Sequence, residues 1–336
     1  MRLQDFIGNQ KMVDLLRARA LPEASLFTGP AGVGKRTLAL ALAALANCKS
    51  PSSHDLCESC PSCVKVSLNS HPDIILFSPE KGKIRIESMR WLSKEAHFRP
   101  FEGAYRFFII DQAEEMTIEA ANSILKTLEE PPETTRLILI SELPRRLLAT
   151  IRSRCQTFSF RSLRRKEIVD CLQKQGKSED CQVRAMFSEG SIGTALQLDV
   201  DRTLEDRDRM FGLLKSWCTR KSFQLLYEAC QKQPLMGDLK KRDRVKRYLE
   251  LLQLLLEDLY FISAARLDHL VNQDRMEDLE RLSKNIELDW IKKFLYYVER
   301  SKWEVDHYVN PLMCFETLWL RTRTKNADVR DFHGQI

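Results

Sequence analysis

The stretch GPAGVGKRTLALALAALANC, Gly29 to Cys48, decides the fold. It has the form GxxxxGK, in which glycines let backbone N–H groups turn toward a phosphate and the lysine supplies a positive charge. The apolar run SLFT precedes it and an Ala- and Leu-rich segment follows it, as the strand–loop–helix context of a phosphate loop requires. One residue departs from the motif, because Arg36 stands where a Ser or Thr hydroxyl would hold Mg²⁺. The sequence therefore predicts a phosphate loop whose metal ligation is impaired.

Short apolar runs alternate with helical patterns between residues 25 and 160, which favours an α/β domain with a parallel sheet. The predicted strands are SLFTG, DIILF, RFFIID, RLILIS and TFSF. RFFIID and RLILIS are almost continuously apolar, as expected of strands that are covered on both faces. From about residue 163 onward the strand-like runs fade, so we expect the rest of the chain to be helical.

The rest of the predicted nucleotide site is also degenerate. Thr37 comes one residue late, and one residue on a helix turns the side chain by about 100°, away from a metal. Asp111 ends an apolar strand as in a Walker B element, but Gln112 follows it, and glutamine cannot accept a proton from water. Glu114 and Glu115 are expected on the surface of the next helix, and Ser141 at a strand end is a candidate γ-phosphate sensor. The candidate nucleotide-binding residues are Gly29, Gly32, Gly34, Lys35, Thr37 and Asp111.

Four cysteines lie in one excursion after the loop helix, at Cys48, Cys57, Cys60 and Cys63. Thiolates at this density can close a tetrahedral zinc site, which would contribute on the order of 10 kcal/mol to local folding. Two alternatives stay open at this point: an iron–sulfur cluster, or His54 or His71 in place of one cysteine. Six further cysteines are scattered and are interpreted as small core residues, namely Cys155, Cys171, Cys181, Cys218, Cys230 and Cys314.

Length, charge and the distribution of apolar residues limit the number of domains and the class of protein. A chain of 336 residues has room for roughly two or three domains, and its net charge of +6 is too small to indicate nucleic-acid binding by itself. The N-terminus has no apolar segment followed by a cleavage site, so we expect a cytoplasmic protein. The most apolar run, residues 248–262, contains Glu250, Glu257 and Asp258, which argues against a membrane span.

Four segments after the phosphate loop carry a family resemblance. They are NSILKTLEEPP (residues 122–132), TIRSRCQ (150–156), SEGSIGTAL (188–196) and HYVNPLMCFETLWLR (307–321). In this order they resemble the AAA+ subunits of the bacterial DNA polymerase III clamp loader, and the likeness covers nearly the whole chain.

The resemblance implies an α/β AAA+ fold and three domains. These are a RecA-like AAA+ domain at residues 1–161 with a zinc excursion at 48–63, an all-α lid at 162–203 and an all-α collar at 204–336. It implies a heteropentamer with tau/gamma and delta subunits that places a sliding clamp on primer-template DNA at the expense of ATP. It also implies that Arg154, in the motif Ser153, Arg154, Cys155, is an arginine finger that acts in trans on a neighbouring ATPase subunit.

The departures from that family indicate which kind of subunit this is. Motor subunits resemble GSxRDAL in the lid, whereas this chain has Gly193 in place of the arginine. Together with Arg36 and Gln112 this favours a non-catalytic stator subunit that takes part in the polymerase holoenzyme but has no ATPase activity of its own. An active AAA+ motor ATPase is the alternative, because Gly34 and Lys35 are retained. A zinc-dependent DNA-binding protein acting alone is a third hypothesis.

Overall fold

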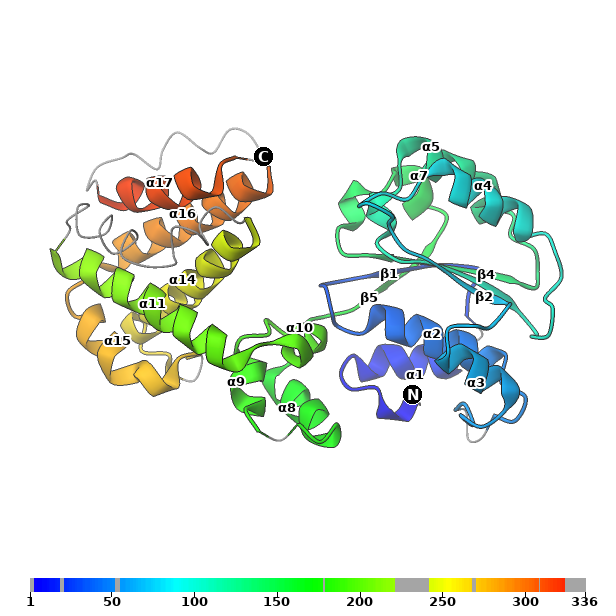
Figure 1. The fold of residues 1–336 in the computed structure, drawn as a ribbon, viewed down its shortest axis with the longest axis horizontal. Coiled ribbons are helices and arrows are strands. Elements are labelled where there is room, and N and C mark those ends of the chain that lie inside the picture. The colour runs from blue at the N-terminus through cyan, green and yellow to red at the C-terminus, as the bar shows by residue number, and fades with distance from the viewer. Residues whose placement is uncertain are drawn as a thin grey trace. The chain divides into compact units, whose positions relative to one another are not determined.

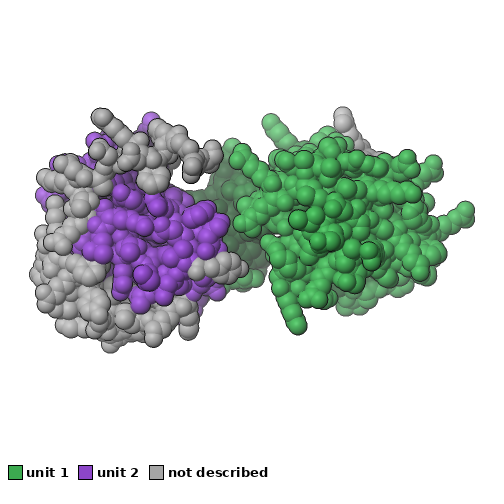
Figure 2. All heavy atoms as spheres, turned by 90° about the horizontal axis from the view of Figure 1, so that it is seen from above, with its two compact units in different colours: residues 1–198 green, residues 199–336 purple. Residues whose placement is uncertain are grey.

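The computed structural model of this protein describes residues 3–18, 21–51, 55–177, 179–220, 242–267, 270–307 and 309–323. The chain forms two compact units, residues 1–198 and 199–336, which Figure 2 colours separately. The expected AAA+ domain and most of the expected lid belong to the first unit. The helix α11 (Val200–Arg220) runs through the expected lid boundary at residue 203, so the three-domain division stays a prediction.

A five-stranded sheet with the order β2-β3-β4-β1-β5 forms the centre of the first unit, and every adjacent pair is parallel. The strands are β1 (Ala24–Thr28), β2 (Ile74–Phe77), β3 (Arg106–Ile110), β4 (Thr135–Ser141) and β5 (Gln156–Ser159). All five coincide with the predicted apolar runs. Because β1 lies between β4 and β5, the loop that follows it opens at the carboxyl edge of the sheet, flanked by the ends of these two strands.

Helices cover both faces of this sheet (Figure 1), which confirms the predicted α/β fold class. One face carries α1 (Gln10–Ala18), α2 (Lys35–Ala46) and α3 (Pro61–Ser67). The other carries α4 (Ile86–Glu95), α5 (Ile118–Ser123), α6 (Leu125–Glu129) and α7 (Ala149–Arg152). Short 3-10 turns lie at Leu3–Asp5, Ala113–Glu115 and Pro144–Arg146.

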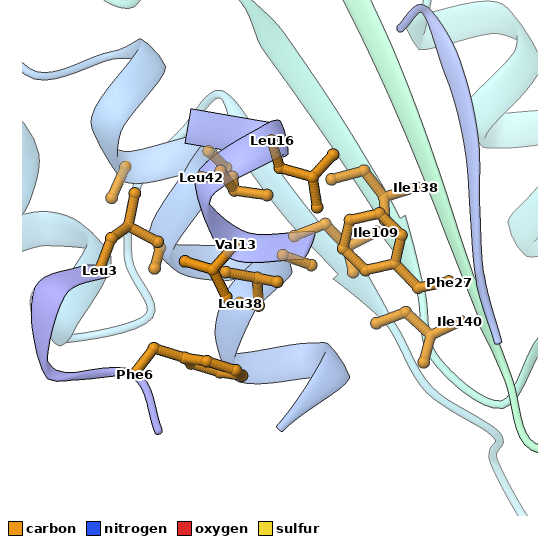
Figure 3. Packing of buried hydrophobic residues seen from close by; sticks show 14 of the residues in the cluster. Leu3, Phe6, Val13, Leu16, Phe27, Leu38, Leu42, Ile109, Ile138 and Ile140 are labelled. Carbon is orange, nitrogen blue, oxygen red and sulfur yellow. The ribbon is translucent and has the colours of Figure 1, made fainter. Parts of the chain in front are cut away.

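Alternate residues of each strand supply two separate cores. Phe27, Ile109 and Ile138 point toward α1 and α2, where Figure 3 shows them beside Val13 and Leu38. Leu26, Phe108, Ile110, Leu137 and Leu139 face the opposite helices. The period of two along each strand explains why strands buried on both faces have an unbroken apolar sequence.

Three short helices follow the sheet within the first unit: α8 (Arg165–Lys174), α9 (Cys181–Met186) and α10 (Ile192–Gln197). They share a small core that includes Ile168, Leu172 and Ala195. Ser191 caps α10 by accepting a hydrogen bond from the Thr194 N–H. These helices lie within residues 162–203, the segment predicted to be a lid, and they are called the lid helices below.

The second unit is helical throughout its described residues. Its helices are α11, α14 (Arg242–Ser263), α15 (Met276–Ser283), α16 (Leu288–Asp306) and α17 (Pro311–Arg323), with a 3-10 turn at Gln273–Arg275. Trp319 is fully buried and contacts Trp217, Phe294 and Phe315 edge to face. The buried Asp258 carboxylate accepts hydrogen bonds from the N–H groups of Val271 and Asn272, both at 2.8 Å.

The scattered cysteines largely fit the core interpretation. Cys155, Cys181 and Cys314 are buried, and Cys171 and Cys218 are half-buried. Cys230 lies outside the described residues.

Candidate functional site: a closed phosphate loop, an exposed arginine and a four-cysteine cluster

The phosphate loop joins β1 to α2 as predicted. Three glycines of the loop have positive φ angles that residues with a side chain rarely adopt: 139° at Gly29, 65° at Gly32 and 93° at Gly34. A Cβ atom at Gly29 would lie 2.2 Å from the Phe160 carbonyl oxygen, so the first glycine also lets the loop pass this backbone. α2 begins at Lys35 directly after Gly34. The backbone thus has the form of a phosphate cradle.

Lys35 is turned inward onto its own loop. Its ammonium group donates to the carbonyl oxygens of Gly29 at 2.6 Å and Pro30 at 2.5 Å, and the residue is only 5% exposed. Burial lowers the pKa of Lys35, while the nearby carboxylates of Glu142, Glu114 and Asp111 oppose that shift. A phosphate would have to replace two charge-assisted hydrogen bonds that the lysine already makes.

Arg36 pairs with the Walker B carboxylate. Its Nη1 atom lies 3.4 Å from Oδ2 of Asp111, across 75 positions of sequence. In P-loop ATPases this aspartate and the hydroxyl after the lysine hold Mg²⁺. Here the residue that replaces the hydroxyl brings its own cation to the aspartate. The residue that departs from the phosphate-loop motif therefore contacts the acidic residue that is retained at the end of β3.

The residues after Asp111 are arranged differently from the expectation. Gln112 has a φ angle of 50°, and Glu114 does not lie on a free helix surface. Oε1 of Glu114 accepts hydrogen bonds from the N–H groups of Glu142 at 2.9 Å and Leu143 at 3.3 Å, so its carboxylate fastens the turn to the end of β4. Glu115 forms an ion pair with Lys83 at 2.9 Å. The expectation for Glu114 was wrong because a 3-10 turn, not a longer helix, follows the strand.

Ser141 does not line the cavity next to the phosphate loop. Its side chain is fully buried, and its Oγ atom has no hydrogen-bond partner among the described residues. Ile140 and Glu142, its neighbours in sequence, line the cavity instead. Successive side chains of a strand point to opposite faces, so the assignment was displaced by one residue.

The lid packs directly against the phosphate loop. The Gly193 N–H donates to the Gly32 carbonyl oxygen at 3.0 Å. A Cβ atom at Gly193 would lie 3.2 Å from Cα of Gly32, and one at Gly32 would lie 2.1 Å from Oγ of Ser191. Glycine at position 193 therefore lets the backbones of Gly193 and Gly32 come close together. It also means that this position carries no arginine side chain.

The cavity between loop and lid measures about 280 Å³. Ligand pockets commonly measure roughly 300 to 1,000 Å³, so this one is small for a whole nucleotide. Of the six candidate residues, Gly32, Gly34, Lys35, Thr37 and Asp111 line it, and Gly29 does not.

Arg154 lies away from this cavity. It follows α7, and its side chain is 31% exposed. Its guanidinium donates to the carboxylate of Glu129 from Nε at 2.6 Å and also from Nη2, and to the Thr150 carbonyl oxygen from Nη1 at 2.8 Å. The neighbouring Cys155 is buried, and burial raises the pKa of its thiol to about 12. Cys155 thus anchors the backbone in the core beside the half-buried arginine.

The four predicted cysteine ligands come together. The sulfur atoms of Cys48, Cys57, Cys60 and Cys63 all lie within 4.8 Å of one another. The Sγ of Cys48 is 3.6 Å from those of Cys57 and Cys63 and 4.0 Å from that of Cys60. Four thiolates at a Zn–S distance of about 2.3 Å in a tetrahedron are roughly 3.8 Å apart, so the donor set fits one metal ion. A disulfide would need about 2.05 Å.

Local structure prepares this cluster. Pro61 starts α3, and the Cys60 sulfur caps that helix by accepting from the Cys63 N–H at 3.5 Å. The Cys60 N–H in turn donates to the Cys57 sulfur at 3.3 Å. This bond, together with hydrogen bonds from Ser59 and Cys48, lowers the pKa of Cys57 to about 6. The thiolate is the form that binds a metal.

The two histidine alternatives have different outcomes. His71 is buried and lies outside the cysteine cluster, where its Nε2 is 3.0 Å from Oγ of Ser62 and its Nδ1 accepts from the Asp73 N–H at 3.1 Å. His54 lies outside the described residues.

Comparison with known proteins decides the family. The model for "DNA polymerase III, delta subunit" matches residues 8–164. The delta' subunit of Bacillus subtilis DNA polymerase III is 32% identical over 262 residues, which cover 78% of each chain. The chain belongs to the family of DNA polymerase III delta' subunits.

Two further relatives match shorter parts of this chain. The delta' subunit of Pseudomonas aeruginosa is 40% identical over 39% of this chain and 41% of its own. The tau subunit of Bacillus subtilis is 31% identical over 59% of this chain but only 37% of its own length. None of the described helices combines the length and apolar content that a bilayer crossing requires.

Sequence reasoning missed two carboxylates of this delta' chain. Asp55 accepts hydrogen bonds from the N–H groups of Leu3 at 2.9 Å, Gln4 at 3.0 Å and Leu56 at 2.8 Å, and so ties the N-terminal segment to the cysteine excursion. Glu129 holds Arg154. In the sequence Glu129 stands out only as part of the segment LEEPP. That segment indicates the family, but it does not indicate which side chain Glu129 contacts.

Proposed function

We propose that this delta' chain is the non-catalytic stator subunit of the DNA polymerase III clamp loader. The observation that carries the proposal is the Arg36–Asp111 pair, in which a guanidinium contacts the carboxylate that would help to hold Mg²⁺ in a P-loop ATPase. Without that metal the β- and γ-phosphates lose their main electrostatic partner. Gln112 adds a second deficit, since it cannot take a proton from the attacking water.

Under this proposal, Arg154 is the residue through which the chain contributes to ATP hydrolysis. A guanidinium stabilises the charge that develops on a transferring γ-phosphoryl group, and such fingers contribute about 10³ to 10⁵ in rate in related NTPases. Arg154 is exposed enough to reach a neighbour, while buried Ile151 and Cys155 fix the backbone around it. We therefore assign Arg154 to the ATP site of an adjacent motor subunit.

The partners follow from the family. The proposed complex is a cytoplasmic heteropentamer with tau/gamma and delta subunits, which acts on a sliding clamp and on primer-template DNA. In it this chain holds a fixed position and completes a neighbouring active site.

For the cysteine cluster we propose a structural zinc ion. Four thiolates that surround one point leave no open coordination position for catalysis. A multi-iron cluster would need the sulfurs farther apart, since they bind different irons. Zinc would fix the excursion that Asp55 ties to the N-terminal segment.

An active motor ATPase remains the second candidate, because the loop glycines and Lys35 are retained. Calorimetric titration of the isolated chain with ATP, with and without Mg²⁺, separates the two. We expect no Mg²⁺-dependent affinity and no turnover. Turnover that disappears in Lys35→Ala would establish a motor instead.

The finger is tested in the reconstituted loader. Arg154→Ala should leave assembly intact and lower the clamp-stimulated ATP turnover by the share of the site that it serves. Arg152→Ala is the matched control, because Arg152 is an exposed arginine two residues earlier in the same segment. Lys35→Ala should keep full loading activity. Normal turnover in Arg154→Ala, with the complex intact, would remove the finger assignment.

A further inference from the structure

The ion pair between Arg154 and Glu129 has a definite geometry. Nε and Nη2 of Arg154 both donate to one carboxylate oxygen, Oε1 of Glu129, and Nη1 donates to the Thr150 carbonyl oxygen. These contacts join the end of α6 to α7 and hold the guanidinium along one side.

We propose that Glu129 is a positioning residue for the arginine finger. It holds the Nε–Nη2 edge of the Arg154 guanidinium so that the terminal edge, between Nη1 and Nη2, points outward to a phosphoryl group of the neighbouring subunit. This inference rests on the proposed function of Arg154.

The count of donors supports it. A guanidinium has five N–H groups, one on Nε and two on each terminal nitrogen. Glu129 and Thr150 use three of them, one on each nitrogen. Each terminal nitrogen therefore retains one N–H with no partner among the described residues. Two N–H groups side by side are the arrangement with which arginine binds phosphate in a bidentate manner.

Both side chains are attached to buried neighbours. Leu128, next to Glu129, and Ile151 and Cys155, on either side of Arg154, belong to the same apolar core. Glu129 is also the last residue of α6, where the negative end of the helix dipole favours a nearby cation. The core thus sets the distance between the two backbones, and the ion pair sets the direction of the guanidinium.

A pair this exposed adds little to the stability of the fold. The side chains of Arg154 and Glu129 are 31% and 46% exposed, where water screens their attraction. Its effect would instead fall on catalysis, because a misplacement of about 1 Å can cost roughly 10²-fold in rate.

The test uses the reconstituted loader and measures kcat and KM for ATP. In Glu129→Ala we expect assembly and KM to be unchanged and more than about half of the Arg154-dependent part of kcat to be lost, in keeping with the sensitivity of rate to position. Glu129→Gln should retain most of it, because one amide oxygen can accept both hydrogen bonds. Glu130→Ala is the matched control, since Glu130 is the exposed neighbour.

The double variant Glu129→Ala with Arg154→Ala completes the design. If Glu129 acts through Arg154, the double variant has the same kcat as Arg154→Ala alone. Unchanged or raised kcat in Glu129→Ala, while Arg154→Ala still lowers it, would overturn the positioning role and leave the finger standing. Unchanged kcat in Arg154→Ala would instead remove the proposed function itself.

Discussion

Replacing Arg36 by threonine should give this chain Mg²⁺-dependent nucleotide binding. The change restores the hydroxyl after the lysine and frees Asp111, which are the two protein groups that hold Mg²⁺ in P-loop ATPases. The lost pair is 3.4 Å long, and its side chains are 50% and 19% exposed, so its removal should cost about 0 to 1 kcal/mol of unfolding free energy. For a unit of this size that corresponds to roughly 2 to 4 °C or less in Tm.

The signal from bound nucleotide is larger than this cost. Ligand at 100 times Kd stabilises the folded state by about 2.7 kcal/mol, or roughly 5 to 10 °C. Thermal unfolding with ATP, with and without Mg²⁺, is the assay, and Arg90→Thr, at an exposed position of α4, is the control. Hydrolysis should stay absent, because Gln112 remains. The reasoning fails if the original chain shows the same Mg²⁺-dependent shift, or if Arg36→Thr shows none.

Three more outcomes are expected. Cys60→Ser should release the metal and loosen the excursion, which elemental analysis and proteolysis would detect; full metal content would exclude Cys60 as a ligand. Asp55→Asn should cost about 2 to 3 kcal/mol in denaturant unfolding, because a charged acceptor of three N–H groups is lost. Burial opposes ionisation of Asp55, but these hydrogen bonds outweigh it and lower the pKa of its carboxyl group. The stability that Asp55 contributes is therefore present above about pH 4 and is lost as the pH falls through the folded-state pKa. A difference in unfolding free energy between the two proteins that does not change with pH would contradict this. Gly32→Ala, at a φ of 65°, should increase hydrogen exchange at the Gly193 amide, and unchanged protection would refute the lid contact.

The fold could be predicted from sequence because its signals are local. Five apolar runs became five strands, since residues buried on both faces leave no polar alternation to misread. The parallel order then brings the loop after β1 and the Asp111 end of β3 to one edge of the sheet. The clustering of the four cysteines could also be predicted, because their spacing keeps them within one short excursion.

The contacts that close the site were not predictable, because they join distant positions. Arg36 was recognised only as a missing hydroxyl, and its pairing with Asp111 depends on how two strands are ordered. Gly193 was recognised as a missing arginine, while its close approach to Gly32 appears only when the lid is placed. The error at Ser141 has a different cause, since a shift of one residue on a strand reverses the face.

The charges of the degenerate site argue for a state that needs no ligand. In P-loop ATPases the lysine contacts the phosphates of the nucleotide, and the Walker B aspartate holds Mg²⁺. Here Lys35 donates to two carbonyl oxygens of its own loop, and Asp111 is paired with Arg36. Arg154 is the opposite case, because its described partners leave two N–H groups available. A phosphate-loop site whose charged groups pair with one another, together with an arginine elsewhere on the surface that keeps two N–H groups available, is consistent with the proposed role of this chain at the active site of a neighbouring subunit.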